Sequence, residues 1–91
     1  MEDVLLLSEK HVVGNIRKIR EYRAYTQKYL ATKLKISQNA YSKIEIGDSK
    51  LTIDRLFHIA MILNVEVANL LTLNQNDLIR IIADGNEKTA R

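Results

Sequence analysis

Two short amphipathic segments that lie almost end to end constrain the fold of this chain more than any other feature. The first runs from Thr26 to Leu34, the second starts after Ser37, and only Lys35 and Ile36 precede that serine in the connection. Both segments have apolar residues at helical spacing, and Thr26 and Ser37 are residue types that cap helix N-termini. Two helices joined by so short a connection have no room to turn back antiparallel, so they must cross steeply.

The side chains of the two segments separate into an inner and an outer set. Ala31 lies where the helices would cross, and its small side chain allows them to approach closely. The outer face of the second segment carries polar residues, because residues one, four and five apart share one side of a helix. The outer set is Gln38, Asn39, Ser42 and Lys43, and the inner set is Leu30, Leu34, Ile36, Tyr41 and Ile44. This pattern is typical of a helix-turn-helix.

The rest of the chain also indicates helices joined by short turns, since it contains no proline and only three glycines. We expect a first helix from Ser8 or Glu9 to Ala24, a fourth that Thr52 caps, and a short fifth around residues 67–71. The fourth is predicted to bury Ile53, Leu56, Phe57, Ala60 and Leu63. The fold class that follows is an all-α bundle.

The sequence also indicates where helices end, but it leaves the secondary structure of the C-terminal region open. Gly47 and Asn64 follow apolar helical stretches, and both are expected to end a helix in the left-handed conformation. Residues 77–83 fit either a strand, by their β-branched content, or a helix, by their apolar spacing. We expect residues 87–91 to fray.

Composition limits the chain to one domain. With 91 residues, of which 46% are hydrophobic, it can bury one compact core. It has no cysteine, which excludes disulfides and thiolate metal sites and suits a reducing cytoplasm. Its apolar runs are too short for a membrane span, and its start lacks the basic leader and long apolar stretch of a signal peptide.

Positive charge is concentrated in one part of the chain. Residues 14–50 contain nine lysines and arginines against three acidic residues, a net charge of +6, whereas residues 1–13 sum to −2 and residues 51–91 to −1. Such an uneven distribution fits either a surface that meets a polyanion or a solvated basic surface without a partner. The charge distribution alone does not favour one of these two interpretations over the other.

The spaced motifs of residues 16–71 resemble the Cro/repressor-type helix-turn-helix regulators, the lambda-repressor-like or xenobiotic-response-element family. The resemblance rests on Ile19-Arg20-Glu21, Thr26-Gln27 with Leu30-Ala31, Ser37-Gln38-Asn39, Ser42-Lys43-Ile44-Glu45 with Gly47, and Leu56, Ile59-Ala60 and Leu63-Asn64-Val65. The chain departs from the family at Lys35, where the family usually has glycine. A lysine with positive φ there costs about 1 kcal/mol, which the turn can tolerate.

The resemblance implies a compact five-helix lambda-repressor-like DNA-binding domain over residues 14–72. Residues 1–13 would form an N-terminal extension with the start of the first helix, and residues 73–91 a C-terminal extension. The third helix would enter the major groove of double-stranded DNA. The resemblance also suggests a partly buried structural ion pair between Arg20 and Glu45 that ties the first helix to the end of the third.

The chemistry of the outer residues agrees with DNA contact. Glutamine and asparagine amides pair bidentately with adenine edges, and helix N-termini and lysines bind phosphate. The expected base contacts are Gln38, Asn39, Ser42 and Lys43, and the expected phosphate contacts are Thr26, Gln27, Lys28, Ser37 and Lys50. Outside such a motif Gln38 and Asn39 would be read as solvated surface amides, and Lys43 fits a base or a phosphate equally well.

A single recognition helix reads only a few base pairs, so we expect a homodimer on a near-palindromic operator. The dimerisation candidates are the apolar residues beyond the motif, namely Leu70, Leu71, Leu73, Leu78, Ile79, Ile81 and Ile82, with Val4 to Leu7 as further candidates. The alternative is that these residues pack within one chain.

Other functions remain open beside a transcriptional regulator that acts by occupying an operator. The same fold fits the antitoxin of a toxin–antitoxin pair, which binds a protein partner, or a controller of a restriction–modification or mobile-element operon. We expect no catalytic activity, cofactor or metal site, because His11 and His58 lack ligand partners at useful spacing and no nucleophile or glycine-rich phosphate motif occurs.

Overall fold

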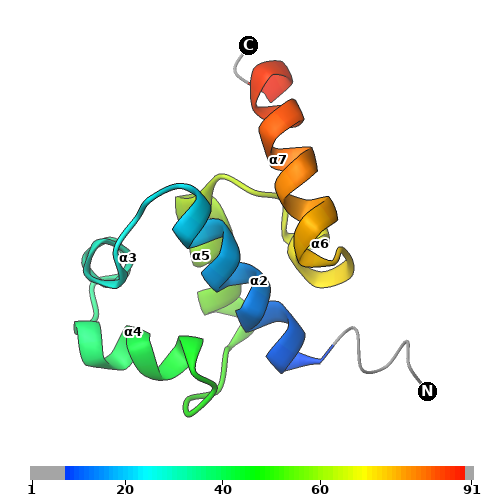
Figure 1. The fold of residues 1–91 in the computed structure, drawn as a ribbon. Coiled ribbons are helices and arrows are strands. Elements are labelled where there is room, and N and C mark those ends of the chain that lie inside the picture. Colours follow the sequence, from blue (N-terminus) through cyan, green and yellow to red (C-terminus); the bar gives the residue numbers. More distant parts are fainter. Residues whose placement is uncertain (1–7, 90–91) are drawn as a thin grey trace.

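The computed structural model describes residues 8–89, and the side chains as far as residue 84. All regular structure in this range is helical, in the order α2 (Glu9–Tyr22), α3 (Gln27–Leu34), α4 (Gln38–Glu45), α5 (Ile53–Leu63), α6 (Val67–Thr72) and α7 (Gln75–Thr89). In Figure 1, α3 and α4 lie on one side of the central pair α2 and α5, and α6 and α7 lie on the other. The predicted all-α class is therefore confirmed.

Four helices begin at a serine or threonine whose side-chain oxygen accepts a hydrogen bond from the backbone N–H three residues later. The caps are Ser8 of α2, Thr26 of α3, Ser37 of α4 and Thr52 of α5. Each bond satisfies one of the N–H groups that the first turn of a helix leaves unpaired. These local bonds fix where the sequence starts each helix.

Helix ends follow from residues that adopt the left-handed conformation. Gly47 has φ +87°, Asn64 φ 57° and Lys35 φ 63°, so the predicted helix ends are confirmed and the turn between α3 and α4 forms without glycine. The expectation for the first helix is wrong by two residues: α2 ends at Tyr22, because Ala24 itself has φ 61° and turns the chain toward α3.

The core lies between α2 and α5 and extends to all the other helices. It contains Val12, Ile16, Ile19, Leu30, Ala31, Leu34, Tyr41, Leu56, Ile59, Ala60, Leu63, Leu70, Leu78 and Ile82. Two residues that α5 was predicted to bury are not in it, since Ile53 is 72% exposed and Phe57 is 53% exposed. Helix α5 buries the stripe that contains Leu56 and Leu63, and Ile53 and Phe57 lie on the neighbouring stripe of the same helix.

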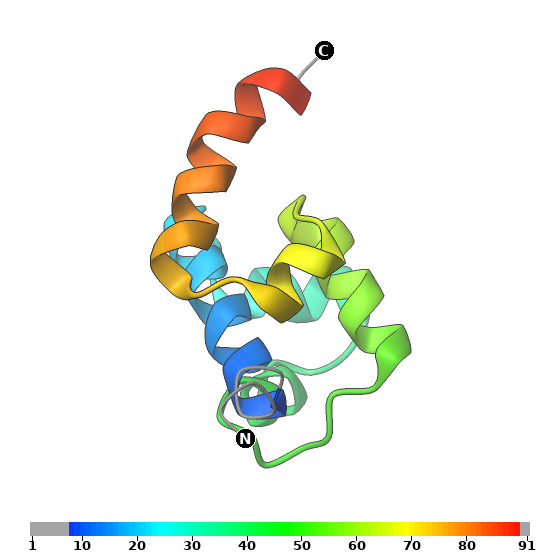
Figure 2. The same cartoon turned by 90° about the vertical axis from the view of Figure 1, so that its right-hand side faces the viewer.

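The open question for residues 77–83 is settled in favour of a helix, α7, which continues to Thr89 and therefore past residue 87, where fraying was expected. Residues 90–91, and Val4 to Leu7 as dimerisation candidates, lie outside the described residues. Figure 2 shows that α7 starts beside α2 and then runs away from the other helices. Its first residue approaches α2 at Gly14, where an added Cβ would lie 3.3 Å from Nε2 of Gln75.

Helix α7 changes the interpretation of the dimerisation candidates. Leu70, Leu78 and Ile82 belong to the core, because α6 and the first turns of α7 pack on the same bundle, so these three are buried within the chain itself. Leu71, Leu73 and Ile79 are half-buried against that core, and Ile81 is exposed. In the described part of the chain no helix is long and apolar enough to cross a membrane.

Candidate nucleic-acid interface

Helices α3 and α4 cross steeply at the edge of the molecule. In Figure 1, α3 is seen nearly end-on while α4 lies across the view. The connection is closed by a hydrogen bond from the N–H of Ile36 to the carbonyl oxygen of Ala31, 3.0 Å long. Tyr41 and Ile44 of α4 are buried against α2 and α3, which fixes the side that α4 turns inward. The predicted crossing of two short helices is thus present.

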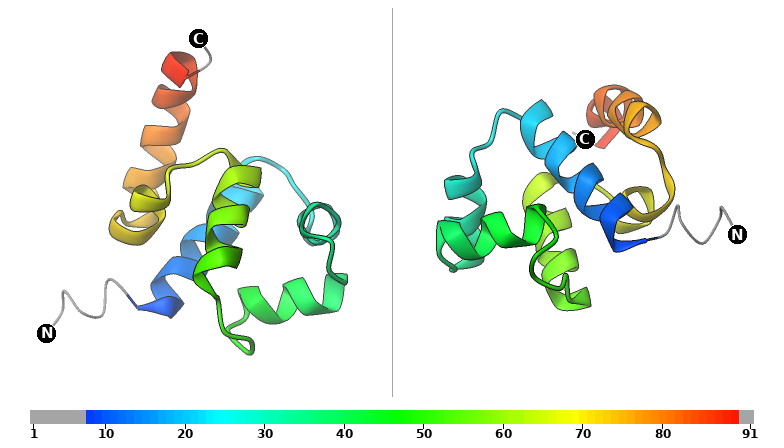
Figure 3. Two further views of the ribbon diagram at one scale, coloured as in Figure 1. Left: turned by 180° about the vertical axis from the view of Figure 1, so that it is seen from behind. Right: turned by 60° about the horizontal axis from the view of Figure 1, so that its bottom comes forward.

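The opposite side of α4 faces outward. Gln38, Asn39 and Lys43 are exposed, and Ser42 is half-buried. Figure 3 shows α4 at the periphery of the bundle, with none of the other helices beyond it. The structure therefore places the four residues expected to read bases together on one accessible helix face.

One further residue of this face was missed by the sequence analysis. Ile46, the C-cap of α4, keeps a helical backbone with φ −90° and ψ −2° and is 64% exposed. It follows Ser42 by four residues and therefore continues the outer stripe of α4. The helical spacing was a usable signal, but an isoleucine in such a pattern suggests a core position.

The five residues expected to contact phosphate surround the N-termini of α3 and α4 and the loop after α4. The Thr26 and Ser37 oxygens accept hydrogen bonds of 2.9 Å and 3.0 Å from backbone N–H groups, which leaves each hydroxyl hydrogen free to donate. Lys28 and Lys50 are exposed. Gln27 differs, because its amide nitrogen donates to Oε1 of Glu45 at 3.1 Å and part of its donor capacity is used within the protein.

Glu45 of α4 is the centre of a buried polar cluster. Its side chain is 2% exposed, and that of Arg20 on α2 is 11% exposed. The Arg20 guanidinium donates from Nε to Oε2 at 2.6 Å and from Nη2 to Oε1 at 3.2 Å, and the Tyr41 hydroxyl donates to Oε2 at 2.6 Å. The Nη1 of Arg20 also donates to the carbonyl oxygen of Tyr25 at 2.8 Å. The two residues expected to form an ion pair thus meet at the base of the exposed α4 face.

The pKa values of this cluster reflect its burial and its hydrogen bonds. Burial acts to raise the pKa of the Glu45 carboxyl, but hydrogen bonds from Arg20, Tyr41 and Gln27 outweigh it and hold that pKa below its ordinary value. The hydrogen bond to Glu45 raises the pKa of Arg20. Burial, followed by the hydrogen bond to Glu45, raises the pKa of the Tyr41 hydroxyl. Near neutral pH the cluster is therefore an ion pair with a protonated tyrosine.

A second arginine has a structural role that the sequence analysis did not foresee. The Nε of Arg23 donates to the carbonyl oxygen of Leu63, and its Nη2 donates to that of Asn64 at 3.2 Å. These carbonyls end α5, where helical partners are missing. Arg23 therefore joins the end of α2 to the end of α5.

Among residues 8–84, the His, Cys, Asp and Glu side chains form no group of three that could hold a metal ion. His58 is exposed on α5, and His11 is half-buried on α2.

An all-helical bundle with this steep α3–α4 crossing and an outward polar face on the second helix defines the class of helix-turn-helix proteins. A family model described as "Helix-turn-helix" matches residues 16–70, more than half of the chain. The chain belongs to the Cro/C1-type helix-turn-helix family, and it is a DNA-binding transcription regulator. It matches no curated protein and no solved structure.

Proposed function

We propose that this protein regulates transcription by occupying a near-palindromic operator as a homodimer, with α4 of each copy in the major groove. The observation that carries the proposal is the pairing of an exposed amide-bearing face with a buried anchor. Gln38 and Asn39 point outward on α4, and Glu45 fastens the same helix to α2 through Arg20. A reading helix held in this way can present side chains at fixed positions.

The chemistry of that face suits base edges. The amide of Gln38 or Asn39 can donate from its nitrogen to N7 of adenine and accept through its oxygen from the exocyclic N6 amine in one bidentate contact, which discriminates by about 1–3 kcal/mol. Lys43 on the next turn is long enough for a guanine edge or a phosphate. These contacts would specify sequence.

The surrounding groups suit the phosphate backbone. The N-termini of α3 and α4 direct free backbone N–H groups outward, and the Thr26 and Ser37 hydroxyls retain a hydrogen to donate. Lys28 of α3 and Lys50 of the loop after α4 are exposed and add positive charge. Such contacts set the register of a protein on the duplex and supply most of the salt-dependent affinity.

The proposal is tested by selecting sites with the full chain from a random pool of duplex DNA. We expect enrichment of a site with two inverted halves whose centres lie about 34 Å apart. In a gel-shift titration, Asn39→Ala should weaken binding to the selected site by roughly 5- to 150-fold, while its binding to unrelated DNA stays the same. The matched control is Asn76→Ala, an exposed asparagine of α7, which should leave both affinities unchanged. A pool without enrichment would contradict the proposal.

The backbone contacts have a separate readout. Lys28→Ala should weaken binding to all sequences alike and reduce the slope of log affinity against log salt by about one unit. Arg80→Ala removes an exposed cation from α7 and is the control that should keep the slope. Equal slopes for wild type and Lys28→Ala would exclude Lys28 from the interface.

A further inference from the structure

A hydrogen bond joins the first turn of α2 to the loop that follows α4. The backbone N–H of Leu51 donates to Oε2 of Glu9, the first residue of α2. The two residues are 42 positions apart, so the contact depends on the tertiary structure. Glu9 lies outside residues 16–70, which the helix-turn-helix family model matches. The bond therefore connects a segment before the matched domain with a loop inside it.

The loop that receives this bond consists of residues 46–52, between the end of α4 and the start of α5. Its first part is tied to α4, because the N–H of Ser49 donates to the carbonyl oxygen of Lys43 at 3.1 Å. Its last residue, Thr52, caps α5 with its hydroxyl oxygen. Lys50, which is exposed, lies between these two fixed parts.

The bond to Glu9 restrains the backbone of Lys50, although Lys50 itself is neither donor nor acceptor. The N–H of Leu51 belongs to the same planar peptide unit as the Cα and the carbonyl group of Lys50. On the other side of Lys50, Ser49 is held by α4. The backbone of Lys50 is therefore fixed from both sides, and its side chain leaves the protein at a defined point.

We propose that Glu9 is a positioning residue for DNA binding, which holds the loop after α4 so that Lys50 meets the phosphate backbone. This rests on the proposed function, in which Lys50 is a phosphate contact. A loop that is ordered in the free protein loses less conformational entropy on binding than one that the DNA must order. Glu9 thereby increases affinity, although its own negative charge beside the loop is repelled by phosphate.

Two substitutions separate the hydrogen bond from the charge. Glu9→Gln removes the repelled charge and keeps an oxygen that can accept the bond, so it should bind DNA at least as tightly as wild type. Glu9→Ala removes both. The net contribution of one hydrogen bond corresponds to roughly a 2- to 13-fold change in an equilibrium constant. Glu9→Ala should therefore bind DNA more weakly than Glu9→Gln by a factor in that range.

The test is a fluorescence-anisotropy titration of the full chain with a short duplex of mixed sequence, because phosphate contacts do not depend on base sequence. The ratio of the affinities of Glu9→Gln and Glu9→Ala should fall to about one when Lys50→Ala is added, since no side chain is then left to position. Lys28→Ala removes a phosphate contact of α3, outside the loop, and is the matched background in which the ratio should keep its full value.

The salt dependence gives a second readout that a general loss of stability would not change. Glu9→Ala should reduce the slope of log affinity against log salt, relative to Glu9→Gln, by up to about one unit, the share of one phosphate contact. Far-UV circular dichroism verifies that each variant is folded.

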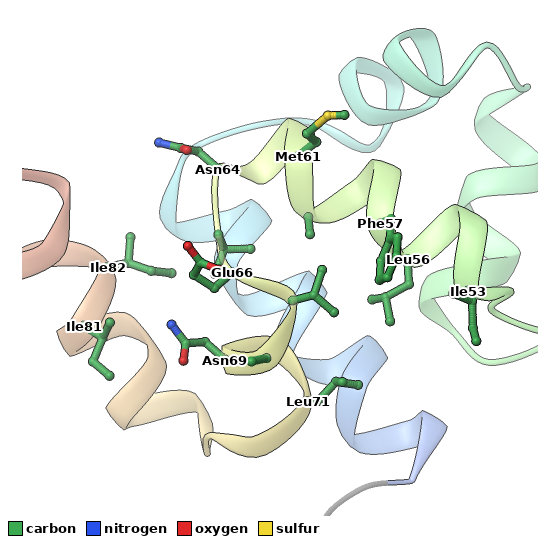
Figure 4. A pocket seen from close by; sticks show the side chains of 14 residues that line it. Ile53, Leu56, Phe57, Met61, Asn64, Glu66, Asn69, Leu71, Ile81 and Ile82 are labelled. Carbon is green, nitrogen blue, oxygen red and sulfur yellow. The ribbon is translucent and has the colours of Figure 1, made fainter. Parts of the chain in front are cut away.

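Glu66 is the matched control for the removal of an acidic side chain. It is exposed at the start of α6, and its side chain makes no cap hydrogen bond. Figure 4 shows it among the residues that line the pocket between α5 and α7. Glu66→Ala and Glu66→Gln should bind the duplex with affinities within about twofold of each other.

Equal affinities of Glu9→Ala and Glu9→Gln would overturn the proposal, because the bond to Leu51 would then contribute nothing to binding. A ratio that keeps its full size with Lys50→Ala, or that falls equally with Lys28→Ala, would do the same, since Glu9 would then not act through Lys50. Failure of the proposed operator function is distinguishable from these results. A chain without sequence preference still binds the mixed duplex through its phosphate contacts.

Discussion

Replacing Arg20 by methionine tests the most specific structural feature of the reading helix, its buried anchor. The substitution keeps most of the side-chain length and removes the guanidinium that donates twice to Glu45. The carboxylate, 2% exposed, would keep only the neutral donors Tyr41 and Gln27. Removing one partner of a buried ion pair costs about 3–5 kcal/mol, because the other charge is left buried without compensation.

This loss in free energy of unfolding is large for a domain of this size. A chain of 91 residues is expected to have a free energy of unfolding of about 5–14 kcal/mol, so Arg20→Met removes about a fifth of it or more. At about 4–8 °C per kcal/mol, Tm should fall by at least 12 °C. We expect the variant to remain folded only at the lower temperatures of the wild-type range.

The destabilisation caused by Arg20→Met should also depend on pH, in a direction that follows from the protonation of Glu45. Without Arg20, the pKa of Glu45 should rise relative to wild type, because the hydrogen bond and the positive charge that lowered it are gone while the burial remains, so the folded variant binds a proton more readily than the folded wild type. Protonation removes the uncompensated charge. The destabilisation should therefore be smaller at pH 4 than at pH 7.

Urea denaturation followed by circular dichroism at both pH values measures these effects. Arg17→Met is the matched control, because Arg17 pairs with Glu21 at 3.2 Å on the surface and should contribute less than about 1 kcal/mol. Adding Glu45→Met to Arg20→Met should recover part of the loss, since no charge then remains buried. Equal losses for Arg20→Met and Arg17→Met, or a loss independent of pH, would refute the reasoning.

Three further predictions concern other parts of the fold. The wild-type pKa of Glu45 lies below its ordinary 4.5. The stabilising contribution of the carboxylate is therefore complete above pH 4.5 and is lost as the pH falls further. Glu45→Gln should make the free energy of unfolding, measured by urea denaturation, depend less on pH in this acid range. Asn15→Ala should destabilise the chain by about 3 kcal/mol, because the buried amide donates to the carbonyls of Leu70 and Leu73 at 2.8 Å and 2.9 Å, and thermal denaturation measures the loss. Gly47→Ala should cost about 1 kcal/mol in the same assay, purely from the positive φ, since no atom lies within 4 Å of an added Cβ; an unchanged Tm would exclude that strain.

The features that the sequence predicted well are those that short-range chemistry decides. A serine or threonine cap bonds a backbone N–H three residues away, and Asn64 and Gly47 adopt positive φ for reasons within their own dihedral angles. The steep crossing of α3 and α4 follows from the length of their connection alone. Such features do not depend on which distant residues pack against them.

The errors arose where packing over long sequence distances decides. Helix α5 has more apolar residues than one face can bury, and the sequence alone does not say whether Ile53 and Phe57 belong to the buried stripe. Residues 77–83 allow a strand or a helix, and Leu78 and Ile82 are buried because α7 packs on α2. The role of Arg23 depends on carbonyl groups 40 and 41 residues away, which leave no pattern in the sequence.

The candidate site likewise combines features that the sequence predicted with features that depend on tertiary packing. The outward face of α4 was predictable because Tyr41 and Ile44 fix the inward side of the helix. The family resemblance suggested the pairing of Arg20 with Glu45, but nothing in the residue pattern indicated that Gln27 and Tyr41 would donate to the same carboxylate. Convergent hydrogen bonds of this kind require the tertiary structure.

That convergence has a mechanical consequence for DNA binding. Glu45 receives donors from three helices, Arg20 of α2, Gln27 of α3 and Tyr41 of α4 itself, so α4 cannot shift against either neighbour without breaking a buried hydrogen bond. A reading helix held in this way loses little conformational freedom on binding. We therefore expect each α4 to keep its position within its own domain when the spacing of the half-sites differs, so that any adjustment occurs outside the α2–α4 unit.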